Sequence, residues 1–425
     1  MKAVVFHGLG DIRLDEVPEP KIQKSTDALV RITASAICGT DLHMVRGTMP
    51  GMKPGTILGH EAVGVVEEFG SAVQGFKHGD RVVIPSTVCC GQCSYCLAGY
   101  TSQCDNANPN GPQAGTAFFG GPTTTGPLDG LQAEFARVPL ADANLVKLPE
   151  EIGDDQAILL SDIFPTGYFG ADIAEIKPGD TLAVFGCGPV GLFAIISARL
   201  LGAGRIFAID HLADRLDKAK ELGAEPVNFD EQSPTDFLKE QTKGIGVLRA
   251  IDAVGVDAVM PERGPAYAQA KAMKSTFKEE LKEAAKDGTG KTWRGQWAPG
   301  DAPSQVSQWA VESLAKAGTL SIIGVYPETM RRFPIGNATM KNLTMQMGNC
   351  PHRKYLPKLI EIVQSGTIDP RQVLTKLEPM SDVIAAYKEF DKRRPGWIKV
   401  ELIPDNQPEI GSGGTWSGSR LPRVP

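Results

Sequence analysis

The chain has two parts with different patterns of apolar and polar residues. Up to about residue 150, short β-type runs such as Ala3–Phe6, Leu29–Ile32 and Val63–Val66 alternate with Gly, Pro and charged turns. Short strands at such spacing are typical of an all-β domain that closes into a partial barrel. From about residue 165, strand-like runs alternate with helical ones, which predicts parallel βαβ units. The chain therefore combines an all-β part with an α/β part.

The apolar runs of the second part predict its elements in more detail. Strands are expected over Leu182–Phe185, Arg205–Ile209, Ala250–Val254 and Leu320–Ile323, and helices over Arg215–Leu222 and Leu192–Leu201. Near residue 350 the alternation ends. Two surface helices and a closing strand are expected there, over Tyr355–Gln364, Ala385–Phe390 and Trp397–Ile403.

These patterns predict a division into domains. We expect a β-rich domain built from two separate segments, 1–163 and 349–404, with an α/β domain over 164–348 between them. A lobe rich in cysteine covers residues 88–106. The tail, 405–425, is rich in Gly, Ser and Pro and is expected to be poorly ordered.

The α/β part also contains an insertion over about residues 257–305. Connections inside a βα unit usually take 2–6 residues, whereas this one holds a helix-like stretch, Ala266–Lys286, and a stretch rich in Gly and Trp, Gly288–Gly300. A solvated excursion, a lid over a cofactor and a subunit contact are all open interpretations of this segment.

Composition and charge narrow the classes of partner. A net charge of −6 and a pI near 5.7 leave no basic footprint, so we expect no nucleic-acid partner. The uncharged run Leu182–Ala198 is slightly short for a membrane span, and glycines and a proline interrupt it. It predicts a buried strand, a tight turn and a buried helix, and no membrane partner. No signal-peptide pattern follows Met1, which predicts a cytoplasmic location.

Cysteine spacing predicts a structural metal site. Five of the eight cysteines lie between Cys89 and Cys104. Four of them can surround one tetrahedral Zn²⁺ and leave no position open for a substrate. This structural zinc would bind Cys90, Cys93, Cys96 and Cys104. Cys89 falls outside the two-residue spacing and is expected to be a bystander.

A glycine-rich motif predicts a dinucleotide site. The apolar run Thr181–Phe185 leads into Gly186, Gly188, Pro189 and Gly191, the GxGxxG pattern between a strand and a helix. Asp210 follows nineteen residues after Gly191, at the end of the next strand. A carboxylate there binds the adenosine ribose and favours NAD over NADP. Arg215 nearby tempers that preference.

The first part of the chain contains half of a second zinc site. Cys38 and, after it, His60 supply one thiolate and one imidazole. At the junction between the two domains, Asp162 adds a carboxylate. Together they would make a three-ligand catalytic site whose fourth position is open to water or an alcohol.

These motifs in combination resemble a known family. CGTDLHMVRG at Cys38–Gly47, GHEAVGVV at Gly59–Val66, the four-cysteine lobe and SDIFPTGYFGA at Ser161–Ala171 are similar to medium-chain zinc alcohol dehydrogenases. They look most like the formaldehyde dehydrogenase and formaldehyde dismutase branch, which has an Asp as third catalytic-zinc ligand, as at Asp162. The resemblance implies a GroES-like, partly barrelled β catalytic domain and a Rossmann doubly wound parallel-sheet coenzyme domain. It also implies a homotetramer or homodimer.

The resemblance implies further roles. Thr40 and His43 match a proton relay, Asp41 matches the residue that orients His60, and Glu61 matches an acidic residue behind the zinc. Lys399 stands where the family often has a pyrophosphate-binding cation; an ordinary solvated lysine is the alternative. The positions that match the nicotinamide and ribose pocket are Thr166, Val190, Val254, Gly255, Gly324 and Val325.

The predicted function is NAD- and zinc-dependent oxidation of a small alcohol or an aldehyde hydrate, with two zinc ions per chain. Formaldehyde and short primary alcohols are the expected substrates. Within the superfamily, a polyol or amino-alcohol dehydrogenase and a formaldehyde dismutase that retains NAD remain open. From a different class, the chain could be an NAD-binding redox sensor. The full set of Cys38, His60, Asp162, Thr40 and His43 argues against that sensor.

Overall fold

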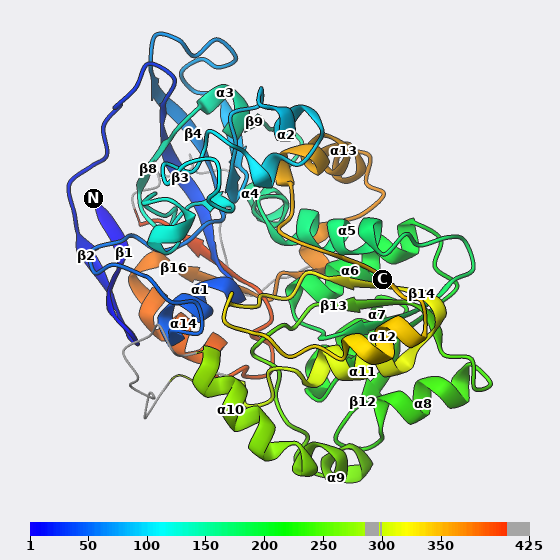
Figure 1. Ribbon diagram of the computed structural model, residues 1–425. Helices are drawn as coiled ribbons and strands as arrows, with labels where there is room; N and C mark the ends of the chain where they lie inside the picture. Colours follow the sequence, from blue (N-terminus) through cyan, green and yellow to red (C-terminus); the bar gives the residue numbers. More distant parts are fainter. Residues whose placement is uncertain (285–296, 298–299, 406–425) are drawn as a thin grey trace.

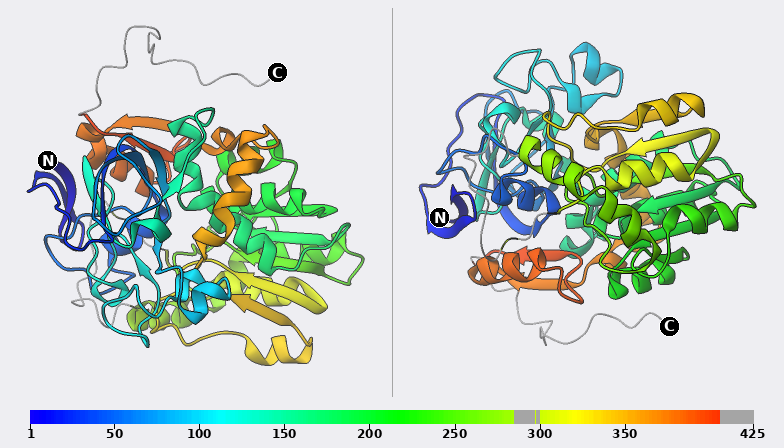
Figure 2. Two further views of the ribbon diagram at one scale, coloured as in Figure 1. Left: turned by 90° about the horizontal axis from the view of Figure 1, so that it is seen from above. Right: turned by 60° about the horizontal axis from the view of Figure 1, so that its bottom comes forward.

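The computed structural model describes residues 1–284, 297 and 300–405. The predicted tail and most of the Gly/Trp-rich stretch lie outside these residues. Two lobes stand side by side, one built largely from the first 160 residues and the other from about 160 to 348 (Figures 1 and 2). Among the described helices, none is long and apolar enough to span a membrane.

The second lobe is built on a six-stranded parallel sheet. Its spatial order is β12-β11-β10-β13-β14-β15, which is the order 3-2-1-4-5-6 of the doubly wound dinucleotide-binding fold. The expected α/β fold class is confirmed. The strands are β10 (Thr181–Phe185), β11 (Arg205–Asp210), β12 (Glu225–Asn228), β13 (Val247–Asp252), β14 (Leu314–Ile322) and β15 (Thr344–Met347).

The alternation of side chains along each strand explains why both faces of this sheet are covered. Leu182 and Val184 of β10 belong to one apolar cluster, and Ala183 and Phe185 belong to another. The first cluster includes α5 (Ile163–Ile173), α6 (Pro189–Leu200), α7 (Ala213–Glu221) and α13 (His352–Gln364). The second includes residues of α8 (Pro234–Gln241), α11 (Gln305–Ser313) and α12 (Ile335–Met340).

The first lobe contains a seven-stranded sheet that joins the two ends of the chain. Its order is β16-β17-β3-β4-β5-β9, with β8 also paired to β3. The return strand β17 runs antiparallel to β3, with Val400 opposite Ile37. The strands are β3 (Ala28–Ile37), β4 (Ala62–Phe69), β5 (Arg81–Ile84), β8 (Phe135–Val138), β9 (Val146–Lys147), β16 (Lys376–Pro379) and β17 (Val400–Ile403).

Smaller elements complete this lobe. A hairpin of β1 (Lys2–Gly8) and β2 (Asp11–Glu16) lies beside α14, and β6 (Thr87–Val88) pairs with β7 (Ala117–Phe118). Its helices are α1 (Gly39–Arg46), α2 (Ser94–Leu97), α3 (Ala141–Asn144), α4 (Asp154–Ala157) and α14 (Val383–Asp391). The proposed domain boundaries are in line with this strand pairing and stay a prediction.

The insertion forms two helices where one was expected. α9 (Gly264–Ala272) is capped by Met273, and α10 (Lys274–Ala284) begins directly after that residue. Phe277 is buried with Ala270 and Ala302 in a small core of their own. Trp297 packs into the apolar core of the first lobe, and its Nε1–H donates to the carbonyl of Gly10 at 3.0 Å. The insertion therefore touches both lobes.

The turn between β10 and α6 leaves no room for a side chain. Gly186 has φ +92°, a conformation that favours glycine, and a Cβ on Gly191 would lie 1.8 Å from the carbonyl oxygen of Gly186. This close approach lets the helix begin directly above the end of the strand.

We expect Gly191→Ala to destabilise the second lobe by roughly 1–3 kcal/mol, the usual range for overpacking. Gly188→Ala is the matched control, because Gly188 has an ordinary φ of −69° and its nearest neighbour, Arg215 Nη1, lies 3.7 Å from a built Cβ. Urea unfolding compares them. Equal stability of the two variants would contradict the close contact.

Candidate active site

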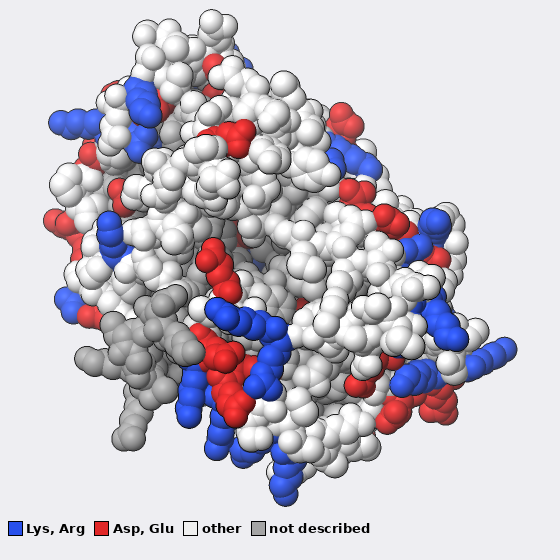
Figure 3. All heavy atoms as spheres, in the orientation of Figure 1, with Lys and Arg blue, Asp and Glu red and all other residues white. Residues whose placement is uncertain are grey.

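A cavity of about 580 Å³ lies between the two lobes. Figure 3 shows the corresponding hollow, with acidic and basic side chains interspersed below it and mostly uncharged atoms around it. Most of the predicted catalytic and cofactor residues line this cavity. They are Cys38, Thr40, His43, His60, Asp162, Thr166, Gly186, Gly188, Pro189, Val190, Asp210, Arg215, Val254, Gly324, Val325 and Lys399.

Three other predicted residues lie just behind the cavity wall. Gly191 packs against Gly186, as described above. Gly255 forms a bridge with Val325. Glu61 follows His60 and is completely buried.

Four buried donors meet at the floor of the cavity. Donor atoms of Cys38, His60, Glu61 and Asp162 all lie within 4.8 Å of one another. Cys38 caps α1 directly after β3, whereas His60 and Glu61 precede β4. Asp162 caps α5, 124 residues further along the chain than Cys38. The fold thus brings the three predicted ligands of the catalytic zinc together.

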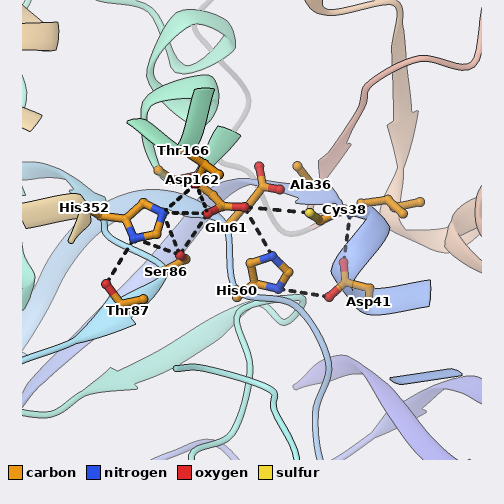
Figure 4. Close-up of polar contacts among 12 residues, drawn as sticks. Ala36, Cys38, Asp41, His60, Glu61, Ser86, Thr87, Asp162, Thr166 and His352 are labelled. Atoms are coloured by element: carbon orange, nitrogen blue, oxygen red, sulfur yellow. Dashed lines mark hydrogen bonds and ion pairs between the residues drawn. The ribbon is translucent and has the colours of Figure 1, made fainter. Parts of the chain in front are cut away.

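The orientation of the donors fits a metal ion. His60 Nδ1 faces Asp41 Oδ1 at 3.1 Å, so its other nitrogen, Nε2, points to Asp162 Oδ2 at 3.5 Å. Asp162 Oδ2 also lies 3.7 Å from Cys38 Sγ. A carboxylate that holds the far nitrogen of a histidine is the usual support of a zinc-binding imidazole. Figure 4 shows these groups converging.

The electrostatics of this cluster favour a cation. Although burial favours the neutral acid, hydrogen bonds from His352 and His60 hold the pKa of Asp162 well below its usual value. Burial raises the pKa of the Cys38 thiol, and the Asp162 and Glu61 charges add to that effect. Burial also opposes charge on His60, but Asp41 and Cys38 outweigh it and raise the pKa of this imidazole well above its usual value. A thiolate, and a neutral imidazole beside it, become favourable once a divalent ion binds.

Lys399 does not have the role expected for it. Its Nζ lies 2.6 and 2.7 Å from the two carboxylate oxygens of Glu61 and 3.1 Å from the carbonyl of Ile37. The side chain is completely buried. Lys399 is thus neither a solvated lysine nor a cation free to meet a pyrophosphate. It neutralises Glu61 behind the metal donors.

Sequence reasoning missed Ser86 and His352, which hold Asp162 together with Thr166. The Oδ1 atom of Asp162 accepts hydrogen bonds from Ser86 at 3.0 Å and Thr166 at 3.2 Å, and lies 2.6 Å from His352 Nε2. His352 is the first residue of α13 and is buried. The chain has only six histidines, and this one follows Cys350 closely in sequence. That rarity is the one signal that could have drawn attention to it.

The four-cysteine lobe forms the predicted second donor cluster. The Sγ atoms of Cys90, Cys93, Cys96 and Cys104 lie within 4.8 Å of one another, and all eight cysteines are free thiols. The N–H of Cys90 donates to Cys104 Sγ at 3.2 Å, and the Asn106 amide donates to Cys90 Sγ at 3.3 Å. Against the effect of burial, backbone N–H groups and the Asn106 amide lower the pKa of Cys90 to about 6. Such N–H···S contacts suit a closed tetrathiolate site.

The cofactor loop has the geometry that its motif predicts. Gly188 caps α6, whose N-terminus faces the cavity. The Asp210 carboxylate accepts the N–H of Cys187 at 2.8 Å and that of His211 at 2.7 Å. It is therefore fixed at the end of β11, at the edge of the cavity.

A buried ion cluster joins His43 to the insertion. His43 Nδ1 lies 2.9 Å from Thr48 Oγ1 and 3.3 Å from Asp257 Oδ2. Arg46 pairs with the same Asp257 and, at 2.6 Å, with Asp391 of α14. Asp257 is the first residue of the insertion. Burial lowers the pKa of His43, with Arg46 and Arg393 contributing, and Asp257 opposes them.

A dinucleotide-type fold that faces a buried set of metal donors defines the chain as an oxidoreductase. Comparison with known families agrees. The model described as alcohol dehydrogenase GroES-like domain matches residues 24–150, and the one described as zinc-binding dehydrogenase matches residues 189–263. An uncharacterized zinc-type alcohol dehydrogenase-like protein of Bacillus subtilis is 38% identical, covering 95% of this chain and 100% of that protein. The chain therefore belongs to the zinc-type medium-chain alcohol dehydrogenases.

Other similar proteins are named as alcohol dehydrogenases or as a formaldehyde dehydrogenase. An alcohol dehydrogenase of Cupriavidus necator is 35% identical over 95% of this chain and 99% of that protein. A glutathione-independent formaldehyde dehydrogenase of Pseudomonas aeruginosa is 34% identical over 95% and 98%. Among solved structures, an alcohol dehydrogenase from Thermus sp. ATN1 matches with a TM-score of 0.75 and 31% identity, over 95% of this chain and 100% of that one.

Lys399→Met leaves the Glu61 carboxylate buried without its partner. We expect the free energy of unfolding to fall by about 3–5 kcal/mol, as is usual when one half of a buried ion pair is removed. Adding Glu61→Gln should recover part of the loss. Urea unfolding measures both variants, and Lys2→Met, at an exposed lysine, should change little. A stable Lys399→Met protein with weakened cofactor binding would instead support the pyrophosphate role.

Asp257→Asn removes a negative charge that raises the pKa of His43. Because burial and the two arginines remain, that pKa should fall further, and His43 should stay neutral to a lower pH. NMR of protein labelled at the histidine Cε1 position follows the titration. The exposed Asp217→Asn change is the control. An unchanged or raised His43 pKa would show that Asp257 does not act on this ring.

Proposed function

We propose that the chain oxidises a small primary alcohol or an aldehyde hydrate, with NAD as the hydride acceptor. The observation that carries the proposal is the arrangement of Cys38, His60 and Asp162 on the floor of the same cavity whose wall is the glycine-rich cofactor loop. When bound, zinc supplies Lewis-acid chemistry that lowers the pKa of an alcohol, and NAD accepts the hydride. The residues of the chain position the metal ligands, transfer the proton and bind the cofactor.

The metal ligands in this proposal are Cys38, His60 and Asp162. Asp41 holds the His60 ring by its far nitrogen and also accepts the backbone N–H of Cys38 at 2.9 Å. One carboxylate thus positions two ligands. Glu61 stays paired with Lys399 behind the site.

Proton transfer is assigned to Thr40 and His43. Both line the cavity, and His43 is buried with a lowered pKa, so it is neutral near pH 7 and able to accept a proton. Asp257, 3.3 Å away, stabilises the charge that His43 then carries. From His43 the proton passes to solvent, while Asp257 and Arg46 at the root of the insertion stay paired.

One feature supports the preference for NAD. Asp210 stands at the carboxyl end of β11, where it would accept ribose hydroxyls and repel a 2′-phosphate. Arg215, on α7, also lines the cavity and tempers this preference. Thr166, Val190, Val254, Gly324 and Val325 would line the nicotinamide and ribose.

We favour substrates of the formaldehyde type because the third metal donor is a carboxylate. The surroundings of the donors suit a small hydrated substrate: hydroxyls of Ser86 and Thr87 lie on one side, and the Phe118 ring packs edge-on to His60 with centroids 6.2 Å apart. Polyol and amino-alcohol dehydrogenation are the alternatives within the superfamily. Assembly as a homodimer or homotetramer stays a prediction.

A formaldehyde dismutase with retained NAD is a second candidate. The contacts of the insertion favour it, because Trp297 and Asp257 both contact the first lobe, at Gly10 and at Arg46. Opening the cleft to release NAD would break a buried ion pair and expose a tryptophan.

The test is steady-state turnover on formaldehyde, short primary alcohols and sugar alcohols, with and without added NAD. We expect NAD-dependent oxidation of the first two. Alcohol and acid formed from formaldehyde without added NAD would identify the dismutase, and turnover of sugar alcohols alone would favour the polyol enzyme. Asp162→Ala and Cys38→Ser should each lower kcat about a thousand-fold or more while the fold survives. Normal turnover in either variant, or none on any substrate in the wild type, would contradict the proposal.

A further inference from the structure

The side chain of Asp162 has two oxygen atoms with different surroundings. Oδ2 faces the metal donors, 3.5 Å from His60 Nε2 and 3.7 Å from Cys38 Sγ. Oδ1 faces away from them, toward Ser86, Thr166 and His352. The shortest of these three contacts is the one to His352 Nε2, at 2.6 Å. Figure 4 shows the imidazole of His352 on the side of the carboxylate opposite Cys38.

His352 is itself held from the other side. Its Nδ1 lies 3.0 Å from Thr87 Oγ1. A nitrogen 2.6 Å from a carboxylate oxygen must carry the hydrogen, and Nδ1 is then free to accept the Thr87 hydroxyl. Both ring nitrogens are thereby occupied, so His352 is not available as an acid or base for a substrate.

The backbone before His352 is fixed to the first lobe. The carbonyl of Asn349 accepts the Ser102 hydroxyl at 2.8 Å, and the carbonyl oxygen of Cys350 lies 3.4 Å from Thr87 Oγ1. Pro351 caps the helix and restricts the backbone directly before His352. The backbone that leads from the second lobe into α13 is therefore held in place, and it fixes the position of His352.

We propose that His352 is a positioning residue that fixes the Asp162 carboxylate so that only Oδ2 can coordinate the catalytic metal. The inference rests on the proposed role of Asp162 as a metal ligand. With Oδ1 engaged by three donors, the carboxylate cannot turn to present both oxygens to the ion, which would fill the position meant for substrate. His352 thus keeps one coordination position open.

Three substitutions separate this role from simple packing. His352→Gln places an amide nitrogen near the position of Nε2 and keeps the donor to Asp162. His352→Asn is shorter, reaches only the position of Nδ1 and loses that donor. His352→Leu fills the space with no donor. The exposed His78→Leu change is the control.

The readouts are the absorption spectrum of the cobalt-substituted enzyme and the rate at which a chelator removes the catalytic ion. In His352→Asn and His352→Leu we expect an altered cobalt d–d spectrum and metal loss about ten- to a hundred-fold faster, the usual scale for groups that support a ligand. His352→Gln should resemble the wild type. The ion of the four-cysteine lobe should be retained in all variants and reports that the chain is folded.

Two results would overturn the inference. A wild-type spectrum and release rate in His352→Leu would show that Asp162 needs no such support. Equal damage in His352→Gln and His352→Asn would show that the ring acts only by filling space. Asp162→Ala distinguishes failure of the underlying site: if it leaves the cobalt spectrum unchanged, Asp162 is not a ligand and the proposed catalytic centre is wrong.

Discussion

Burial of several anionic groups at one point is the constraint on which the structure of the site depends. Cys38, Glu61 and Asp162 can each carry a negative charge, and all three are buried within a few ångströms of one another. Isolated buried charges cost several kcal/mol each unless they are paired. Lys399 neutralises one of them, Glu61. The two that remain can both be charged beside a neutral His60 when a cation lies among them, and a thiolate, a carboxylate and an imidazole suit a divalent metal.

Both lobes contribute residues to this cluster of buried charges. Cys38 and His60 come from the sheet of the first lobe, and Asp162 begins the helix that packs against the cofactor-binding sheet. His352 begins α13, soon after β15 ends the cofactor-binding sheet, and Lys399 directly precedes β17. The chain must therefore leave the first lobe, build the second and come back before the metal donors are fully supported. The order of the segments along the chain therefore decides which residues can support the metal donors.

The cofactor loop and the four-cysteine lobe could be predicted because the residues that form each motif are close together in the sequence. The strand Thr181–Phe185 and the glycines after it form a pattern within a dozen residues, and the four cysteines of the lobe lie within fifteen. The remaining features depend on partners far apart in the sequence. Lys399 and Glu61 are separated by 338 residues, and His352 and Asp162 by 190. No periodicity or spacing connects such pairs, so Lys399 was misinterpreted and His352 was overlooked. The break at Met273 was missed because the helical pattern continues through it.

The most direct test of the central claim is the metal content of the purified chain compared with that of Cys38→Ser. We expect about two zinc ions per wild-type chain and about one in the variant, since the four-cysteine lobe does not depend on Cys38. One zinc ion in the wild type would show that the buried donors at the lobe junction hold no metal. An unchanged two in Cys38→Ser would show that this thiol is not among the ligands.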